Sequence, residues 1–513
     1  MKGSRARRAT TRTVVATVVM ALFVTLAVTP ASTSDSSRSP GAAAIQGGPP
    51  APNVVVILAD DLDALVTEYW EAMPRTQALM QANSLTFNAA YATTPTCCPA
   101  RSALLTGKMA HNNGVWNNVA PYGGVDAFIA NGNESQNVAT YLDAAGYKTA
   151  LMGKYLNLYG SQHGVPPGWD EWFAPISTDF YNGFNYQVND NGNIVSYGSA
   201  PQDHIQTVLT GRATNFIDTQ EADDDEPFFL YLNSIAPHLK IPVSQAHTPN
   251  PFTGEKPPAS PNRWEADMSD KSQAVRMGQF FRWLYWYLFV DFDYARYKGS
   301  LLTLDDMIAD VIENLAANDE LANTYIVFAS DNGYNWGSHW IDGKRAPYEE
   351  SARIPFLVMG PDVVPGSNNE FVTLQDLAPT VMDLAGLGVP ANMDGMSLAP
   401  ILRGESYSWR SDFLGEWEAE FHSTIGFLEA LMNAVFSIPS WRSLHQGDYV
   451  LIEWWSDHQR GGTHEYELYD LAADPYQLTN LIPGGNFGPY AALVNQMIVR
   501  MDQLSACSGA NCN

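Results

Sequence analysis

Asn53-Val54-Val55-Val56-Ile57-Leu58-Ala59 is the stretch that decides the fold class of this 513-residue chain. It is an apolar run of strand length without polar alternation, which is typical of a parallel strand buried on both faces of a sheet. Asp60, Asp61 and Asp63 follow it directly. Because open α/β sheets place their ligand sites beyond the carboxyl ends of such strands, we expect these aspartates to line a site.

Four further apolar runs predict strands that alternate with helices. The predicted strands are Lys148 to Met152, Pro227 to Ile235, Thr324 to Ala329 and Ile354 to Met359. The helical patterns between them are Asn137 to Ala145, Ile205 to Thr219 and Leu301 to Ala317. This alternation predicts an α/β fold with a mainly parallel sheet sandwiched by helices. Polar residues follow the first three of these strands, namely Lys154, His238 and the pair Asp331-Asn332.

Composition divides the chain into four parts. Residues 1–32 carry basic side chains, an apolar run from Val14 to Val28 and small residues near Ala31, which indicates an export signal peptide. Residues 33–52 are rich in Ser, Pro, Gly and Ala and predict a flexible leader. Residues 53–403 form the predicted main domain. Residues 404–513 form a smaller predicted α+β domain, with strands at Tyr449 to Trp454 and Tyr466 to Asp470.

The N-terminus predicts a secreted protein without a stable membrane anchor, because its apolar run is shorter than the ~20 residues that a span needs. The aromatic segment from Phe280 to Phe289 is also too short and has charged flanks. We therefore expect it to form a buried helix or an insertion at the rim of a site. In an exported protein, Cys507 and Cys512 suit a small disulfide loop.

The chain is strongly acidic. It has 28 Lys and Arg residues against 55 Asp and Glu residues, a formal charge of −27. No basic surface is therefore available to release counterions from a nucleic acid, and we expect no nucleic-acid partner. Such a surface also repels anionic substrates, so any anion site needs cations within about one Debye length, ~8 Å at physiological salt.

Cys97-Cys98-Pro99-Ala100-Arg101 opens the stretch with the most specific chemistry. Pro99 predicts a helix from there to about Leu105, which Gly107 ends, so Cys97 would lie at the positive end of a helix. The full spacing is Cys-x-Pro-x-Arg-x-x-x-x-Thr-Gly, and only Cys97 fits it. This spacing resembles the signature of type I sulfatases, in which the cysteine is oxidised to formylglycine.

Two polar pairs at strand ends complete a metal site in this interpretation. Asp60-Asp61 and Asp331-Asn332 offer only oxygen ligands, which favours a hard cation, Ca²⁺ or Mg²⁺, over zinc. The resemblance implies that Cys97 adds a further oxygen ligand after conversion to formylglycine by a maturation enzyme. It also implies an alkaline-phosphatase-like fold, with residues 53–403 as the catalytic domain.

The resemblance assigns roles to the remaining charged residues. Lys154, His238 and Lys344 match the cationic positions that sulfatases place around the sulfate. In the implied mechanism the hydrated aldehyde at position 97, held in part by Arg101, attacks sulfur. Lys154 and Lys344 take up charge on the sulfate oxygens, and His238 protonates the leaving alcohol. The aldehyde then re-forms and expels sulfate.

The chain resembles the N-acetylglucosamine-6-sulfatase and extracellular heparan sulfatase branch of this family. The shared stretches are Gly153 to Asn157, Ser330 to Tyr334, Tyr466 to Asp470, Asp474-Pro475 and the terminal Cys507 and Cys512. The implied partner is a sulfated carbohydrate, and the implied reaction is release of a 6-O-sulfate from N-acetylglucosamine or a related glycan. Trp or Tyr residues are expected to stack on the sugar ring.

One position departs from the family's pattern. Many sulfatases have a histidine two residues after the Lys154 position, where this chain has Leu156. Asn157 cannot act as a base, and His111 and His339 are the two candidates for the elimination step. Alternative functions are a phosphodiesterase or phosphonate hydrolase of the same superfamily, an arylsulfatase, or a non-catalytic glycan-binding protein if Cys97 stays a thiol.

Overall fold

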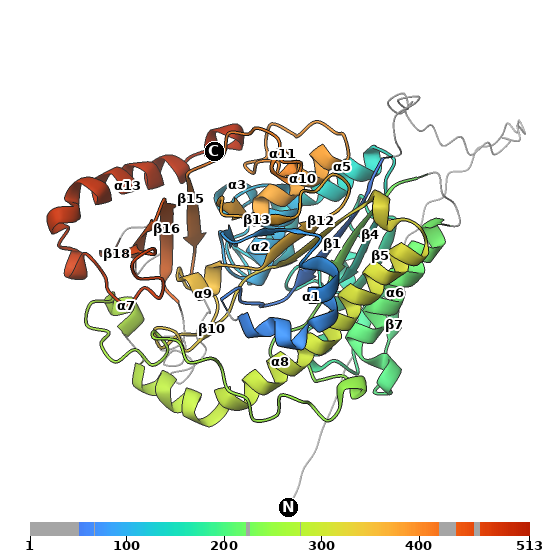
Figure 1. Ribbon diagram of the computed structural model, residues 1–513, viewed down its shortest axis with the longest axis horizontal. Coiled ribbons are helices and arrows are strands. Elements are labelled where there is room, and N and C mark those ends of the chain that lie inside the picture. Colours follow the sequence, from blue (N-terminus) through green and yellow to red (C-terminus); the bar gives the residue numbers. More distant parts are fainter. Residues whose placement is uncertain (1–50, 66, 222–225, 277–278, 420–437, 456–461) are drawn as a thin grey trace, which may run out of the picture. The chain divides into compact units, whose positions relative to one another are not determined.

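One large sheet forms the centre of the chain (Figure 1). The computed structural model describes residues 51–65, 67–221, 226–276, 279–419, 438–455 and 462–513. In these residues the sheet has ten strands. From one edge to the other they are β13 (Gly366–Asn368), β2 (Leu85–Phe87), β12 (Phe356–Met359), β9 (Thr324–Ser330), β1 (Asn53–Ala59), β8 (Phe228–Asn233), β4 (Lys148–Gly153), β5 (Glu171–Ile176), β6 (Gln187–Asp190) and β7 (Asn193–Ser196).

The central strands are parallel, as predicted. β1 lies between β8 and β9 and runs parallel to both, with Val56 opposite Tyr231 and Val327. β4 and β5 continue the parallel arrangement beyond β8. The strand predicted near residue 354 is present as β12, but it runs antiparallel to β9. The sheet is therefore mixed at its edges and parallel where the polar strand ends meet.

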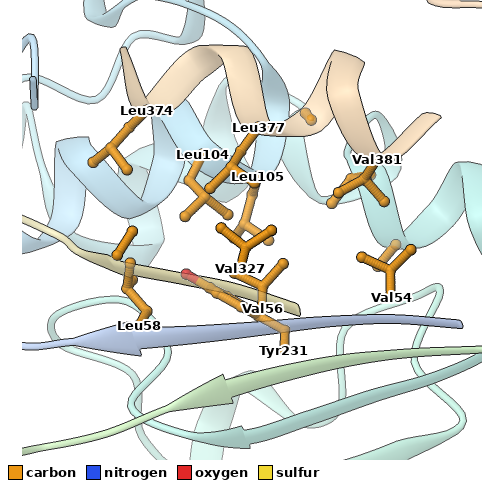
Figure 2. Close-up of a cluster of buried hydrophobic side chains, with 14 of the residues drawn as sticks. Val54, Val56, Leu58, Leu104, Leu105, Tyr231, Val327, Leu374, Leu377 and Val381 are labelled. Atoms are coloured by element: carbon orange, nitrogen blue, oxygen red, sulfur yellow. The ribbon is translucent and has the colours of Figure 1, made fainter. Parts of the chain in front are cut away.

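The side chains of β1 alternate between two apolar layers. Val54, Val56 and Leu58 pack against residues of α2 (Cys97–Thr106) and α10 (Leu377–Leu384), as Figure 2 shows. Val55 and Ile57 face the opposite layer, which contains α6 (Ile205–Glu221) and α8 (Gln279–Ala317). All of these strand residues are fully buried. Burial of each such side chain contributes ~1.5–3 kcal/mol, so the helical layers hold the strand ends in a fixed register.

Helix α2 begins two residues earlier than predicted. Thr96 is extended and Cys97 is the first helical residue, so Pro99 occupies the third helical position. The amide groups of the first helical turn have no partner inside the helix, and a proline is tolerated there for that reason. Gly107 ends the helix with φ 68°, in the left-handed region that glycine adopts without strain. Every residue of α2 is buried.

Helix α8 is continuous across two segments for which the sequence gives separate predictions. It runs through the predicted helix at Leu301 to Ala317 and the aromatic segment before it. The side chains from Phe280 to Phe289 lie outside the described part of the structure, so only the helical prediction for that segment is confirmed. Gly299 lies inside the helix because a Cβ there would lie 2.7 Å from atoms of Asn250 and Val243. Among the described residues, no helix is long and apolar enough to cross a membrane.

A second sheet follows in the C-terminal part; it contains both strands predicted there, and its strands are antiparallel. Its strands are β15 (Asp412–Trp417), β16 (Ser440–Gln446), β17 (Tyr449–Trp455) and β18 (His464–Asp470). Helix α13 (Ala491–Leu504) packs on this sheet, and the predicted disulfide joins Cys507 and Cys512. The predicted signal peptide of residues 1–32 and most of the leader lie outside the described residues. The domain boundary near residue 404 stays a prediction.

The remaining elements are short. The helices are α1 (Pro74–Met80), α3 (Ala110–Asn113), α4 (Gly124–Ala130), α5 (Val138–Ala144), α7 (Gln273–Arg276), α9 (Glu349–Ala352) and α11 (Ala399–Leu402). The strands are β3 (Ala90–Tyr91) with β14 (Val372–Thr373), and β10 (Asn335–Trp336) with β11 (Asp342–Gly343).

Candidate active site

The predicted metal ligands meet at the carboxyl edge of the main sheet. Ala59 and Ser330 are paired at the ends of β1 and β9, so Asp60 and Asp331 leave the sheet side by side. Cys97, the first residue of α2, lies against them, with its Sγ 3.6 Å from Asp60 Oδ1. Potential ligand atoms of Asp60, Asp61 and Cys97 all lie within 4.8 Å of one another. The structure therefore brings together residues from distant parts of the sequence.

Hydrogen bonds fix the aspartates in place. The backbone N–H of Asp61 donates to Asp331 Oδ1 at 3.1 Å, and Asn332 Nδ2 donates to Asp61 Oδ1 at 2.7 Å. The Tyr297 hydroxyl donates to the Asp61 carbonyl at 3.2 Å. Asp61 has φ 73°, a left-handed conformation that costs energy in a non-glycine residue and persists where the surroundings hold it.

The donor set fits a hard divalent cation. The amide nitrogen of Asn332 donates to Asp61 and to the Gly333 carbonyl. These hydrogen bonds do not involve its amide oxygen. That oxygen is buried and has no hydrogen-bond partner among the described residues. An orphaned buried acceptor beside three buried carboxylates fits a bound cation, since a buried polar atom without a partner is costly. Oxygen-only ligands are those that Ca²⁺ and Mg²⁺ prefer.

Three cationic side chains surround the carboxylates. Arg101 Nε donates to Asp331 Oδ2 at 2.9 Å, and Lys154 Nζ donates to Asp60 Oδ2 at 2.6 Å. Lys344 Nζ lies 2.7 Å from Cys97 Sγ and also donates to Asp61. Arg101 Nη2 is buried and, in the described part of the chain, has no partner. The cluster thus leaves one donor and one acceptor available to ligands from outside the chain.

The charges of the cluster set its protonation. Burial opposes ionisation of Asp60 and Asp61, but the surrounding positive charges, led by Lys154 at Asp60 and by Lys344 at Asp61, together outweigh burial and hold the pKa of each carboxyl below its usual value. Burial raises the pKa of the Cys97 thiol to about 12. The thiolate is the nucleophilic form of cysteine, so an unmodified Cys97 would be a poor nucleophile at neutral pH.

His238 lies at the edge of this cluster. Its Nδ1 is 2.8 Å from the Leu239 carbonyl, which can only accept, so Nδ1 carries a hydrogen. Its Nε2 faces Asp61 Oδ2 at 3.6 Å. Burial lowers the pKa of His238 against the pull of Asp61. The ring stacks on Tyr181 with 4.2 Å between the ring centroids.

The C-terminal sheet supports the loop that carries Lys344. The next residue, Arg345, has φ 80°; its N–H donates to the Pro95 carbonyl at 3.0 Å, close before Cys97. Trp441 Nε1, from β16, donates to the Arg345 carbonyl at 2.7 Å. The position of Lys344 therefore depends on both parts of the protein.

The two candidate elimination bases lie outside this cluster. His111 Nδ1 contacts Glu416 at 2.9 Å, and its Nε2 contacts the Cys507 carbonyl at 3.3 Å. His339 Nδ1 contacts Glu265 at 2.8 Å. In the described residues, His238 is the histidine that contacts the aspartates. Neither His111 nor His339 therefore has a contact that supports the predicted role.

Sequence reasoning missed three residues of the site. Asn233 Oδ1 accepts from Arg101 Nη1 at 3.2 Å, and its position at the end of β8 is a signal that could have found it. Tyr181 lies in a short turn, and Trp441 in the second sheet. Neither position carries a sequence pattern that indicates a site.

Comparison with known proteins places the chain in a family. The family model described as Sulfatase matches residues 52–387, and the one described as N-sulphoglucosamine sulphohydrolase, C-terminal, matches residues 337–506. The chain is 31% identical to N-acetylglucosamine-6-sulfatase of Capra hircus, over 90% of this chain and 84% of that protein. It is 33% identical to the extracellular sulfatase SULF-1 homolog of Drosophila melanogaster, over 71% of this chain and 33% of that protein.

A solved structure shows the same fold. The structure of BT4656 in complex with its substrate D-glucosamine-2-N,6-O-disulfate superimposes with a TM-score of 0.71 and 21% identity, over 88% of this chain and 97% of that chain. The matched family model covers well over half of the chain. The chain therefore belongs to the sulfatase family of sulfate-ester hydrolases.

Proposed function

We propose that this protein is a secreted sulfatase that removes a 6-O-sulfate from N-acetylglucosamine or a related hexosamine in sulfated glycans. The observation that carries the proposal is the single buried cluster in which Cys97, the Asp60-Asp61 and Asp331-Asn332 pairs, Lys154 and Lys344 meet. The substrate is supported by the similarity to N-acetylglucosamine-6-sulfatases, and secretion by the N-terminal sequence and the similarity to an extracellular sulfatase.

Residue 97 is proposed to be formylglycine, made from Cys97 by a maturation enzyme. The raised thiol pKa supports this, because the unmodified residue lacks a nucleophile at neutral pH. When hydrated, formylglycine supplies one hydroxyl to attack sulfur and a second whose collapse expels sulfate. Asp60 and Lys344 lie beside this side chain and would hold the oxygens that replace Sγ.

The metal is proposed to be Ca²⁺, with Mg²⁺ as the alternative, held by Asp60, Asp61, Asp331, Asn332 and residue 97. Bound there, it supplies positive charge to the sulfate oxygens. The three carboxylates balance the charges of Arg101, Lys154 and Lys344, so a divalent cation leaves the cluster positive. This local charge offsets the formal −27 of the whole chain at short range.

The side chains of the cluster then have separate tasks. Lys154 and Lys344 are proposed to neutralise the sulfate oxygens, and Arg101 to orient the nucleophile at position 97 through its unpaired Nη2. His238 is proposed to protonate the leaving sugar oxygen in its imidazolium form, in which Nε2 also carries a hydrogen, because Nε2 faces the cluster. An acidic surface gives no long-range attraction to a polyanion, which favours a terminal sulfated sugar over an extended chain.

The test compares two sulfate esters on one preparation of the enzyme. We expect a 6-sulfated N-acetylglucosamine to be cleaved with a higher kcat/KM than a simple aryl sulfate, because contacts with the sugar stabilise the transition state. Robust aryl sulfate turnover without release from the sugar would reject the substrate. Faster cleavage of the matched phosphate ester would favour a phosphoesterase.

The mass of the tryptic peptide containing residue 97 tests the nucleophile. We expect it to be lighter than the sequence mass by the conversion of thiol to aldehyde. Cys97→Ala should abolish turnover, whereas Cys98→Ala is the matched control and should keep the modification and most of the activity. Unmodified Cys97 in fully active enzyme would contradict the mechanism.

A further inference from the structure

Tyr181 is a residue of the site to which no role has yet been given. It lies in the turn η4 (Asp179–Asn182), between β5 and β6. Phe180, one residue earlier, is buried in the apolar layer that contains α6 and α8 and so anchors the turn. Gly183 ends the turn with φ 75°, and a Cβ there would lie 2.7 Å from the side chain of Pro242. The turn is therefore packed directly on the segment that follows His238.

The Tyr181 ring lies against two members of the cluster. It stacks on the His238 ring, with 4.2 Å between centroids and 26° between planes. Lys154 Nζ lies 5.5 Å from its centroid, within the range of a cation–π interaction. Lys154 is already paired with Asp60 at 2.6 Å, so Tyr181 adds little to its position. With its ring engaged in this way, Tyr181 is unsuited to stack on a sugar.

His238 depends more strongly on Tyr181. The Nδ1 hydrogen bond goes to Leu239, the next residue, so it holds the ring only relative to its own loop. The Nε2 atom is 3.6 Å from Asp61, too far for a strong hydrogen bond. His238 has an exposed side-chain fraction of 20%, and the stacked tyrosine forms one wall beside it. Without that wall, the imidazole has room to turn away from the aspartates.

We propose that Tyr181 is a positioning residue, whose ring holds His238 so that Nε2 points at the leaving oxygen of the substrate. The inference rests on the proposed function. In the step concerned, a bond forms between an oxygen of residue 97 and sulfur while the bond between sulfur and the sugar oxygen breaks. The electron pair of the broken bond stays on the sugar oxygen, which takes up the Nε2 proton of the imidazolium form of His238, the form with a hydrogen on both ring nitrogens. The hydroxyl proton of residue 97 passes to the neighbouring Asp60 carboxylate.

The leaving group makes this inference testable. A sugar alkoxide leaves poorly without a proton, whereas nitrophenolate leaves readily without one. A residue that acts through His238 must therefore matter for the sugar ester and hardly for 4-nitrophenyl sulfate. A residue that only supports the fold affects both esters alike.

The experiment uses full-length mature enzyme with Tyr181→Leu, which removes the ring, and Tyr181→Phe, which keeps it. We expect Tyr181→Leu to lower kcat/KM for 6-sulfated N-acetylglucosamine by ~10²-fold and for 4-nitrophenyl sulfate by less than ~3-fold. Tyr181→Phe should remain within ~3-fold of the wild type on both. Tyr197→Leu is the matched control, since Tyr197 stacks on Tyr186 at 5.1 Å in the same region, away from the cluster.

Two further measurements test whether Tyr181 acts through His238. In a His238→Gln background, Tyr181→Leu should cause no additional loss on the sugar ester, because the effects of residues that act as a unit do not add. A crystal structure of Tyr181→Leu should show the imidazole turned from its wild-type orientation.

Equal losses on both esters, additive losses in the double variant, or an unmoved His238 would overturn the inference. So would a Tyr181→Phe variant as poor as Tyr181→Leu, because the hydroxyl rather than the ring would then act. Sulfate release by the wild type tests the proposed function separately. A wild type that cleaves neither ester would refute that function, whereas an active wild type with any of the contrary results would refute only the role of Tyr181.

Discussion

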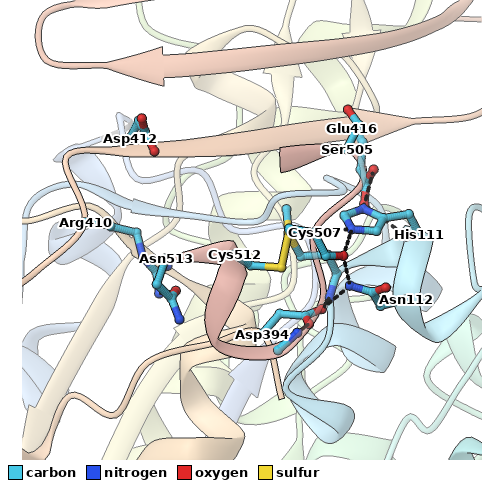
Figure 3. The surroundings of a disulfide bond; sticks show 12 residues. His111, Asn112, Asp394, Arg410, Asp412, Glu416, Ser505, Cys507, Cys512 and Asn513 are labelled. Carbon is cyan, nitrogen blue, oxygen red and sulfur yellow. Dashed lines mark hydrogen bonds and ion pairs between the residues drawn. A yellow bond between two sulfur atoms is a disulfide. The ribbon is translucent and has the colours of Figure 1, made fainter. Parts of the chain in front are cut away.

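The cluster around Cys97 and the junction around His111 contain similar charged groups but differ in whether their buried polar atoms are hydrogen-bonded. We define the junction by His111, Asn112, Asp394, Glu416 and the Cys507–Cys512 disulfide (Figure 3). Each region places a partly or fully buried histidine beside buried carboxylates, and each joins segments far apart in the sequence. In both, potential metal-binding atoms lie within 4.8 Å of one another. Charge and burial therefore do not distinguish a site from a structural contact.

The hydrogen bonds of the junction are complete. Asp394 accepts from the Met109 and Gly509 N–H groups and from Asn112 Nδ2, at 2.7–2.9 Å. His111 Nδ1 contacts Glu416 at 2.9 Å, and its Nε2 contacts the Cys507 carbonyl at 3.3 Å. Cys507 and Cys512 are bonded to each other and so cannot act as thiolate ligands. The hydrogen bonds of the junction therefore connect the C-terminal loop to the segment after α2.

The Cys97 cluster differs because two of its buried polar atoms have no hydrogen-bond partner in the described parts of the chain. Asn332 Oδ1 and Arg101 Nη2 are buried without partners among the described residues. Such atoms cost folding free energy unless a ligand satisfies them. Between these two regions, the unpaired buried atoms, rather than the clustered charge, distinguish the site from the structural contact. The predictions below test that distinction.

The largest effect is expected at the metal site. Asp61→Asn removes a charged oxygen ligand and should lower kcat/KM by ~10²- to 10³-fold, since a bound cation contributes several kcal/mol to catalysis. The wild type should also gain thermal stability when Ca²⁺ is added after chelation, because saturation at 100 times Kd contributes ~2.7 kcal/mol. Asp61→Asn should lose most of that gain in Tm.

Asp394→Ala provides the control for this measurement. It removes a buried carboxylate from the junction and should keep the gain in Tm with Ca²⁺. A Ca²⁺-dependent Tm in Asp61→Asn that matches the wild type would contradict the proposed metal site. Full activity in exhaustively demetallated protein would do the same.

The second prediction concerns the stability of the junction. Asp394→Ala leaves the Met109 and Gly509 N–H groups without an acceptor, and each buried unpaired donor costs ~1–3 kcal/mol. We expect the free energy of unfolding to fall by ~3–4 kcal/mol while kcat/KM stays within ~3-fold of the wild type. Urea unfolding and the sulfatase assay measure the two quantities. A loss of activity without a loss of stability would make Asp394 part of the site.

Much of the Cys97 cluster could be predicted from the sequence. Asp60 and Asp331 follow apolar runs, and parallel strands bring such ends together at one edge. The position of Cys97 follows from its spacing to Pro99 and Gly107, although the helix begins at Cys97 itself. Each of these features depends on a pattern within a short stretch of sequence.

Other features depend on packing between distant segments and could not be predicted. Tyr181 contacts His238 because η4 packs on the Pro242 segment. Trp441 supports Arg345 from another sheet. No sequence pattern shows which carboxylate a histidine contacts, so the contacts of His111 and His339 could not be predicted either.

The third prediction is a pH dependence that belongs to the junction. Burial lowers the pKa of His111, but Glu416 outweighs it and raises the pKa to about 9, above the ~6.5 of an unfolded histidine. A raised folded-state pKa gives stability that is complete below pH ~6.5 and is lost as the pH rises through about 9. The loss should reach at most roughly 3 kcal/mol.

Urea unfolding at pH 6.5 and 9.5 measures this loss. His111→Gln removes the titrating group and should flatten the difference between the two pH values, whereas other titrating groups affect both proteins alike. An unchanged difference in His111→Gln would show that other groups cause the pH dependence.

The smallest effect is expected from the disulfide. Cys507 and Cys512 are five residues apart, so their bond closes a short loop and restricts the unfolded chain little. The entropic estimate for such a loop is ~2 kcal/mol, below the ~3 kcal/mol of a 15-residue loop. The double variant Cys507→Ser, Cys512→Ser should lose about that much unfolding free energy. Because His111 contacts the backbone carbonyl of Cys507 rather than its sulfur, the pH dependence should survive in this variant. If the pH dependence disappears with the disulfide, the loop is what holds that carbonyl in place, and the bond contributes to the junction beyond its effect on the unfolded chain.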